Sequence, residues 1–308
     1  MADPPNPAGD TSLPGEEAHQ ESREKENKPS AWRPVTWSHV FGHQPLLLAC
    51  LLIVLVLLPS QIFLLFAPGR DFYYSQPTAT YPGESLLTRP HMDETVPAWL
   101  LGVLTSVLIL LLAALELLLA PRYHRNATSA YHSALLLLLD AIMVNIIVYA
   151  MVSFTKQSVG RPRPDFFARL ASNDIHGITD GRWSYPSGHA ATSMACGTFW
   201  ALHLTWTFFF RPTVGKFKKL ATPQWQADLW SFLEVVVIGI GPVLALFIAT
   251  SRIYDYRHNP SDVNAGALFG IVGTCFWWAR SMGQRGCAQV ASTAAVDGQT
   301  PALHSQYC

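Results

Sequence analysis

Six separate runs of apolar residues, each long enough to cross a bilayer as a helix, constrain this chain more than any other feature. About 20 apolar residues span the hydrocarbon core of a membrane. Inside lipid every backbone polar group needs a partner within the chain, so each run must be helical. The runs cover residues 45–66, 97–119, 131–155, 187–210, 229–250 and 261–280. The sequence therefore predicts an all-α, polytopic membrane protein with six transmembrane helices in one bundle.

The composition agrees with a membrane protein. Charged residues make up 14% of the chain, whereas soluble globular proteins carry about 25%. The formal net charge is zero, which gives no argument for nucleic acid as a partner. The five cysteines show no spacing typical of a zinc site. We therefore expect the bilayer as the environment, no nucleic acid partner, no metal and no cofactor.

Two polar tails flank the apolar runs. Residues 1–44 are rich in Pro, Glu, Lys and Ser, and such a segment buries too little apolar surface to fold alone. Residues 281–308 have a similar polar character. We predict a disordered tail over 1–44, a six-helix membrane domain over 45–280 and a second tail over 281–308.

The basic residues predict the orientation in the membrane, because short loops rich in Lys and Arg stay in the cytoplasm. The loop after the second run contains Arg122 and Arg125, and the loop after the fourth is also basic. The loop after the first run is acidic on balance. Both termini should therefore be cytoplasmic, and the loops after runs one, three and five should be luminal or extracellular. The organelle stays open among endoplasmic reticulum, vacuole and plasma membrane.

Three clusters of polar residues fall on the luminal or extracellular face in this topology. They are Lys156–Asp165, Tyr185–His189 and Ser251–Asp262. The loop after the third run should be outside, yet it contains several basic residues, and an anion-binding role explains them. They are Lys156, Arg161, Arg163, Arg169 and Arg182. Because an even number of crossings separates the second cluster from the third, all three can form one site.

The cations and the start of the fourth run are suited to binding phosphate. Lys156, Arg163 and Arg252 supply positive charge for a group that carries nearly two negative charges. Ser187 and Gly188 lie where a helix begins, and the free N–H groups and the dipole there attract anions.

Two histidines can divide the chemistry. His258 precedes Asp262 by four residues, so the two share a face if that segment is helical. A carboxylate on one imidazole nitrogen leaves the other free as a nucleophile. His189 follows the anion-binding turn and is placed to protonate the leaving alkoxide. No cage of carboxylates and histidines for a metal ion is evident here, so the mechanism should not require Mg²⁺.

The clusters carry a specific resemblance. Lys156-x6-Arg163-Pro164, Pro186-Ser187-Gly188-His189 and Ser251-Arg252-x5-His258-x3-Asp262 resemble the three signature motifs of the type-2 phosphatidic acid phosphatase superfamily. The chain looks like its integral-membrane lipid phosphate phosphatase branch, over about residues 45–280. The runs around Arg163 and Asp255 resemble fungal and plant members most.

The resemblance implies a metal-independent phosphoric monoester hydrolase that acts through a phosphohistidine. His258 would be the nucleophile, His189 the general acid, and Asp262 the residue that orients His258. The phosphate would bind to Lys156, Arg163, Ser187, Gly188 and Arg252. Substrates of the family include phosphatidic acid, lysophosphatidic acid, sphingosine-1-phosphate and diacylglycerol pyrophosphate. The resemblance therefore also allows hydrolysis of a lipid diphosphate.

Purely structural interpretations exist for each motif taken alone. Ser187 can be the N-cap of a helix, Asn259–Asp262 is a sound helix start, and Lys156 can extend to the membrane interface. The joint occurrence of the motifs, in order and on one face, favours catalysis. For the intramembrane residues Glu116 and Asp140 we favour a role in helix packing.

Three other functions were compared with lipid phosphate hydrolysis. A catalytically inactive relative that binds lipids would lack motif histidines or cations, and none is missing here. A haloperoxidase that uses vanadate would be soluble, which the six apolar runs disfavour. A polyprenyl pyrophosphate or a sugar phosphate as substrate stays open.

The glycosylation sequon Asn126-Ala127-Thr128 tests the orientation. It lies in a loop that we place in the cytoplasm, so Asn126 should remain unmodified. The measurement is the mobility of the chain from microsomes before and after glycosidase treatment, beside the Asn126→Gln variant. A glycosidase-sensitive shift that disappears in the variant would invert the predicted topology.

Overall fold

The computed structural model describes residues 87–119, 127–172, 174–210 and 223–296. These residues are largely helical and contain no strand. The long helices are α4 (Ala98–Leu119), α5 (Ala127–Val159), α8 (Gly188–Thr205), α10 (Gln224–Tyr254) and α11 (Pro260–Val296). The short helices α6 (Phe166–Ala171) and α7 (Ile175–Gly181) lie between α5 and α8, and one π-helical turn, η3 (Trp206–Phe210), continues α8.

The helical character of the second to sixth apolar runs is confirmed, because each coincides with a long helix. The run over residues 45–66 and the predicted tail over 1–44 lie outside the described residues. Among those described, α4, the part of α5 from Tyr131 to Val159, and α10 are long and apolar enough to cross a membrane.

Helix α8 is the centre of the bundle and packs against α4, α5, α10 and α11. Its buried face carries small residues, including Ala191, Ala195 and Gly197. A Cβ on Gly197 would lie 2.7 Å from the carbonyl oxygen of Gly241 in α10, so the two backbones touch. Small residues at such interfaces let membrane helices approach closely. Because protein surrounds α8, its surface need not be as apolar as that of a helix facing lipid.

The outer helices are apolar on the faces that point away from the bundle. Val103 and Leu118 on α4, and Phe232, Val243 and Phe247 on α10, are all exposed. An exposed apolar surface of this extent is costly in water and is matched by lipid tails. The described part of the chain is therefore built as a membrane bundle.

The two intramembrane carboxylates connect helices. Glu116 of α4 accepts a hydrogen bond from Ser133 of α5 (2.6 Å) and lies 3.6 Å from Nε2 of His203 in α8. Asp140 of α5 accepts a bond from the indole of Trp277 in α11 (3.0 Å). These contacts between neighbouring helices agree with the packing role that we favoured.

Helix α11 is longer than we predicted. It continues past Arg280 to Val296, into the segment that we expected to be a disordered tail. Residues 281–296 contain several alanines and no proline, and alanine has the highest intrinsic helix propensity. We predicted a tail because the composition of this segment is too polar for burial. A segment that is too polar for burial can still form a helix.

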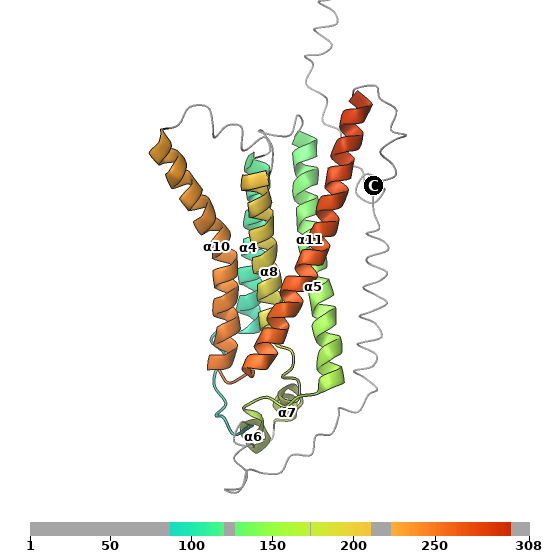
Figure 1. The fold of residues 1–308 in the computed structure, drawn as a ribbon. Coiled ribbons are helices and arrows are strands. Elements are labelled where there is room, and N and C mark those ends of the chain that lie inside the picture. Colours follow the sequence, from blue (N-terminus) through green and yellow to red (C-terminus); the bar gives the residue numbers. More distant parts are fainter. Residues whose placement is uncertain (1–86, 120–126, 173, 211–222, 297–308) are drawn as a thin grey trace, which may run out of the picture.

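The motif-bearing ends of the helices lie together at one end of the bundle (Figure 1). There α5 and α10 end and α8 and α11 begin, next to α6 and α7. Figure 1 also shows that α10 is bent; Pro242 lies inside this helix and removes one backbone hydrogen bond. The bundle thus collects the three clusters at a single surface.

The contact at Gly197 gives a stability prediction. Gly197→Val places a branched side chain against the backbone of α10 and should lower the stability of the bundle by about 1–3 kcal/mol, as overpacking does. Gly102→Val is the matched control, since a Cβ on Gly102 meets nothing within 4 Å. The measurement is thermal unfolding in detergent. Equal midpoints for the two variants would show that α8 and α10 are not packed as described.

Candidate active site

The three clusters are tied together by backbone hydrogen bonds. The N–H of Ser187, at the start of α8, donates to the carbonyl of Asp262 in α11 (2.9 Å). The N–H of Ser184 donates to the carbonyl of Arg161 in the segment after α5 (2.8 Å). A Cβ on Gly266 would collide with the carbonyl of Ser187. These contacts fix the relative positions of the residues predicted to be functional.

His258 lies in the short connection between α10 and α11. Its side chain is buried, and its backbone N–H donates to the carbonyl of Arg252 (3.2 Å). Burial, followed by the positive charges of Arg163 and Lys156, holds the pKa of His258 well below the usual value of about 6.5. The imidazole is therefore neutral near pH 7, the state that a nucleophile requires.

Asp262 does not bond directly to His258. The distance from its Oδ2 to Nδ1 of His258 is 4.0 Å, which is longer than a hydrogen bond. The carboxylate instead accepts hydrogen bonds from Arg161 Nη1 (2.8 Å), the Ser184 hydroxyl (2.6 Å) and the Asn259 N–H (2.9 Å). The bond from Asn259 is the helix-start contact expected for this segment.

The start of α8 has the geometry of an anion site. Ser187 is the N-cap, is fully buried and accepts a bond from the N–H of Ala190 (3.5 Å). Gly188 follows as the first helical residue, and a Cβ there would approach only Val152, at 3.9 Å. The Nε2 atom of His189 is buried and has no hydrogen-bond partner among the described residues. It is therefore available to a bound molecule.

Two of the predicted cations are buried and paired. Arg163 donates through Nη2 to Asp180 of α7 (2.7 Å). Arg252, which is only 1% exposed, donates through Nη2 to Asp255 (2.8 Å), and its Nη1 lies 3.5 Å from Glu94. Each guanidinium has five N–H donors, so these pairs orient the side chain and leave donors for an anion.

A second layer of ion pairs holds the surrounding segments. Asp165 is fully buried and accepts bonds from Arg169 Nε (2.9 Å) and His91 Nδ1 (2.7 Å), and Arg257 lies 3.8 Å away. Arg257 also donates to the carbonyl of Met92 (2.9 Å). These contacts join the segment before α4 to α6 and to the α10–α11 connection.

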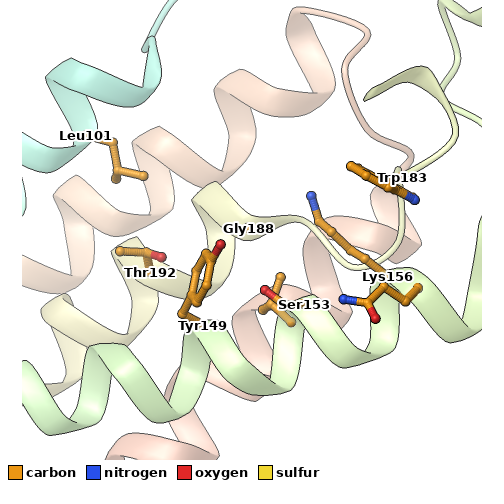
Figure 2. A pocket seen from close by; sticks show the side chains of 9 residues that line it. Leu101, Tyr149, Ser153, Lys156, Trp183, Gly188 and Thr192 are labelled. Atoms are coloured by element: carbon orange, nitrogen blue, oxygen red, sulfur yellow. The ribbon is translucent and has the colours of Figure 1, made fainter. Parts of the chain in front are cut away.

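The third cation lines a pocket. Figure 2 shows Lys156 extending from α5 toward the chain between Trp183 and Gly188. The pocket has a volume of about 280 Å³. Its lining consists of Leu101, Tyr149, Val152, Ser153, Lys156, Gln157, Trp183, Gly188 and Thr192. One part of the wall is thus cationic while Leu101, Val152 and Trp183 make another part apolar.

All of the predicted site residues lie at this end of the bundle, and three residues beyond the prediction join them. Ser184 bonds to Asp262, Asp180 bonds to Arg163, and Glu94 lies beside Arg252. Ser184 precedes the second motif by only two residues, so its closeness in sequence to that motif could have identified it as a site residue. Nothing in the sequence indicates the partners of Asp180 and Glu94. Among the described residues, no group of three or more His, Cys, Asp or Glu could hold a metal ion.

The chain is similar to known proteins over a region that includes the predicted site residues. The model of the PAP2 superfamily matches residues 134–285. A PA-phosphatase related-family protein of Dictyostelium discoideum is 27% identical over 79% of this chain and 80% of its own length. Lipid phosphate phosphatase 2 of Arabidopsis thaliana is 28% identical over 65% of this chain and 68% of its own length. A Schizosaccharomyces pombe protein named "Probable diacylglycerol pyrophosphate phosphatase 1" is 32% identical over 48% of this chain and 53% of its own length. No solved structure matches the chain at comparable significance.

The paired arginines give a prediction for catalysis. Arg163→Ala and Arg252→Ala should each lower kcat/KM for hydrolysis of a phosphate monoester by a factor on the order of 10²–10³, because each removes stabilisation of transition-state charge. Arg280→Ala is the matched control, since Arg280 stacks on Trp277 away from the site. Steady-state kinetics of the three purified variants decide the matter. Wild-type kinetics in both site variants would remove these cations from the mechanism.

Proposed function

We propose that this chain, whose residues 134–285 match the model of the PAP2 superfamily, is a membrane phosphatase that hydrolyses lipid phosphates without a metal ion, through a phosphohistidine at His258. The observation that carries the proposal is the meeting of all three motif segments at one end of the bundle. There a buried neutral imidazole lies in the positive field of Lys156 and Arg163. Such a site can attack phosphorus and hold the charge that develops.

The first chemical step is phosphoryl transfer to the enzyme. Nε2 of His258 attacks the phosphorus atom while the bond from phosphorus to the lipid oxygen breaks. His189 gives its proton to the departing alkoxide, so the lipid leaves as a neutral alcohol. The guanidinium groups of Arg163 and Arg252 and the N–H groups at Gly188 stabilise the equatorial oxygens.

The second step returns the enzyme to its starting state. A water molecule attacks the phosphorus of phosphohistidine, and neutral His189 accepts the proton that the water loses. The bond from phosphorus to Nε2 breaks, and inorganic phosphate is released. His258 is again neutral and His189 is again protonated, so the two steps balance.

A lipid as substrate is supported by the pocket beside Lys156. Its lining joins a cation to apolar side chains (Figure 2), which suits a molecule with a phosphate head and a hydrocarbon body. The names of the relatives in Arabidopsis and Schizosaccharomyces refer to lipid phosphates and to diacylglycerol pyrophosphate. Phosphatidic acid, lysophosphatidic acid and diacylglycerol pyrophosphate are the substrates that we propose to test first.

A diphosphate substrate fits the same chemistry. In a lipid pyrophosphate the leaving group is a lipid phosphate, which is far less basic than an alkoxide and depends less on a proton from His189. The relative named for diacylglycerol pyrophosphate favours this second activity. A polyprenyl pyrophosphate would be cleaved by the same steps.

The proposal includes the membrane topology predicted from the apolar runs. The three membrane-spanning candidates among the described helices, together with α8, α11 and the run over residues 45–66, would make six transmembrane helices. With both termini in the cytoplasm the site opens to the lumen or the exterior. Product phosphate would then be released on that side.

Chelation tests the absence of a catalytic metal. Hydrolysis of the three lipid phosphates should persist in EDTA, because the arginines and Lys156 supply the positive charge that Mg²⁺ would otherwise provide. The measurement is phosphate release by the purified full chain, with a water-soluble sugar phosphate beside the lipids. Loss of activity in EDTA with recovery in Mg²⁺ would refute the mechanism, and preference for the sugar phosphate would refute the substrate class.

The role of His189 predicts a dependence on the leaving group. His189→Ala should lower kcat/KM for phosphatidic acid by a factor on the order of 10²–10⁴, the usual contribution of general acid catalysis. The ratio kcat/KM reports the transfer of phosphate to the enzyme and not the later attack of water. The loss should be smaller for a nitrophenyl phosphate, because nitrophenolate departs without a proton. Kinetics with both substrates provide the comparison. An equal loss for the two would mean that His189 does not protonate the leaving group.

A further inference from the structure

Ser184 occupies the space between the proposed nucleophile and its acid. Its hydroxyl lies 2.6 Å from Oδ2 of Asp262 and 3.5 Å from Nδ1 of His258, whereas those two atoms are 4.0 Å apart. Ser184 and Asp262 are fully buried, and His258 is 4% exposed. Solvent is therefore excluded from the contact between the three residues.

The carboxylate of Asp262 is held where it is and cannot turn toward His258 at low cost. Oδ1 accepts a bond from Arg161 (2.8 Å), and Oδ2 accepts a bond from the N–H of Asn259 (2.9 Å). Moving Oδ2 by the distance needed to bond Nδ1 would weaken these bonds. Ser184 is held as well, because its own N–H donates to the carbonyl of Arg161 (2.8 Å).

The direction of the hydrogen bonds follows from which groups can donate. An ionised carboxylate only accepts, and a serine hydroxyl has a single proton. The hydroxyl of Ser184 therefore donates its proton to Asp262, and its oxygen can only accept a hydrogen bond from His258. Nδ1 of His258 must then carry the proton and face that oxygen. This tautomer leaves Nε2 without a proton, as nucleophilic attack requires.

We propose that Ser184 is a positioning residue that connects Asp262 to His258, holding the imidazole in the tautomer whose Nε2 attacks phosphorus. The inference rests on the proposed function, since it assigns a task within that reaction. It replaces the direct contact between Asp262 and His258 expected from their spacing. The backbone of Ser184 also bonds to His258 and raises the pKa of its imidazole. The hydroxyl and the backbone of Ser184 therefore contribute separately to the orientation of His258.

Removing the hydroxyl alone separates these contributions. Ser184→Ala keeps the backbone carbonyl and should lower kcat by about tenfold, the value of one buried hydrogen bond. KM and inhibition by inorganic phosphate should stay near wild type, because no phosphate-binding side chain changes. Ser193→Ala is the matched control: Ser193 is also buried, and among the described residues its hydroxyl bonds to the backbone carbonyls of Ala190 and Ala245.

A double-variant experiment tests whether Ser184 acts through Asp262. If it does, Ser184→Ala combined with Asp262→Asn should be no slower than Asp262→Asn alone. Three results would overturn the inference: a kcat for Ser184→Ala within twofold of Ser193→Ala, a weakening of phosphate binding equal to the loss of kcat, or additive losses in the double variant. His258→Ala is assayed beside them. Full activity in that variant would contradict the proposed function, whereas its inactivity beside a normal Ser184→Ala would contradict only the inference.

Discussion

The contact between the start of α8 and the start of α11 determines where both histidines lie. The N–H of Ser187 bonds to the carbonyl of Asp262, and Gly266 has no room for a side chain against the carbonyl of Ser187. His189 follows Ser187 along α8, and His258 lies two residues before α11. The close approach of the two helices therefore brings together the two histidines that we propose to be catalytic. A small residue deeper in the bundle allows that approach, since a Cβ on Gly270 of α11 would collide with the carbonyl oxygen of Ala191 in α8. The helix packing and the chemistry therefore depend on the same small residues.

Charge balance is the second constraint on this end of the bundle. An unpaired guanidinium is costly to bury, and a pair is tolerated only when its geometry and hydrogen bonds are good. Arg163 and Arg252 meet this requirement through Asp180 and Asp255, with Glu94 close to Arg252. The carboxylates hold the guanidinium planes in place before a substrate arrives, and each guanidinium keeps N–H donors that these pairs do not use. Preorganised charge of this kind stabilises a transition state without reorganisation during the reaction.

The parts that could be predicted from the sequence are those encoded locally. Hydrophobic runs predicted the long helices of the described residues, and fixed spacings selected the histidines, the cations and the N-cap of the candidate site. Asp180 as a partner of Arg163 and Glu94 as a partner of Arg252 could not be predicted, because both carboxylates come from segments whose positions depend on tertiary packing. The four-residue spacing from His258 to Asp262 predicted a direct hydrogen bond between them. In the structure the hydroxyl of Ser184 lies between the two side chains instead. Spacing indicates which residues share a face of a helix, but not what packs between them. The C-terminal extension of α11 was also not predicted. An apolar run shows which part of a helix can lie in the membrane, but a helix can continue beyond that run.

The identity of the residue that carries phosphate tests the central claim most directly. Purified full chain would be mixed with labelled phosphatidic acid, quenched in base because phosphohistidine is labile in acid, digested and sequenced by mass spectrometry. The account predicts phosphate on His258 and no labelled peptide from His258→Ala. With a labelled nitrophenyl phosphate, whose leaving group needs no proton, it predicts retention of the label in His189→Ala, in which the activation of water is impaired. Phosphate on His189, or hydrolysis by His258→Ala at the wild-type rate, would contradict it.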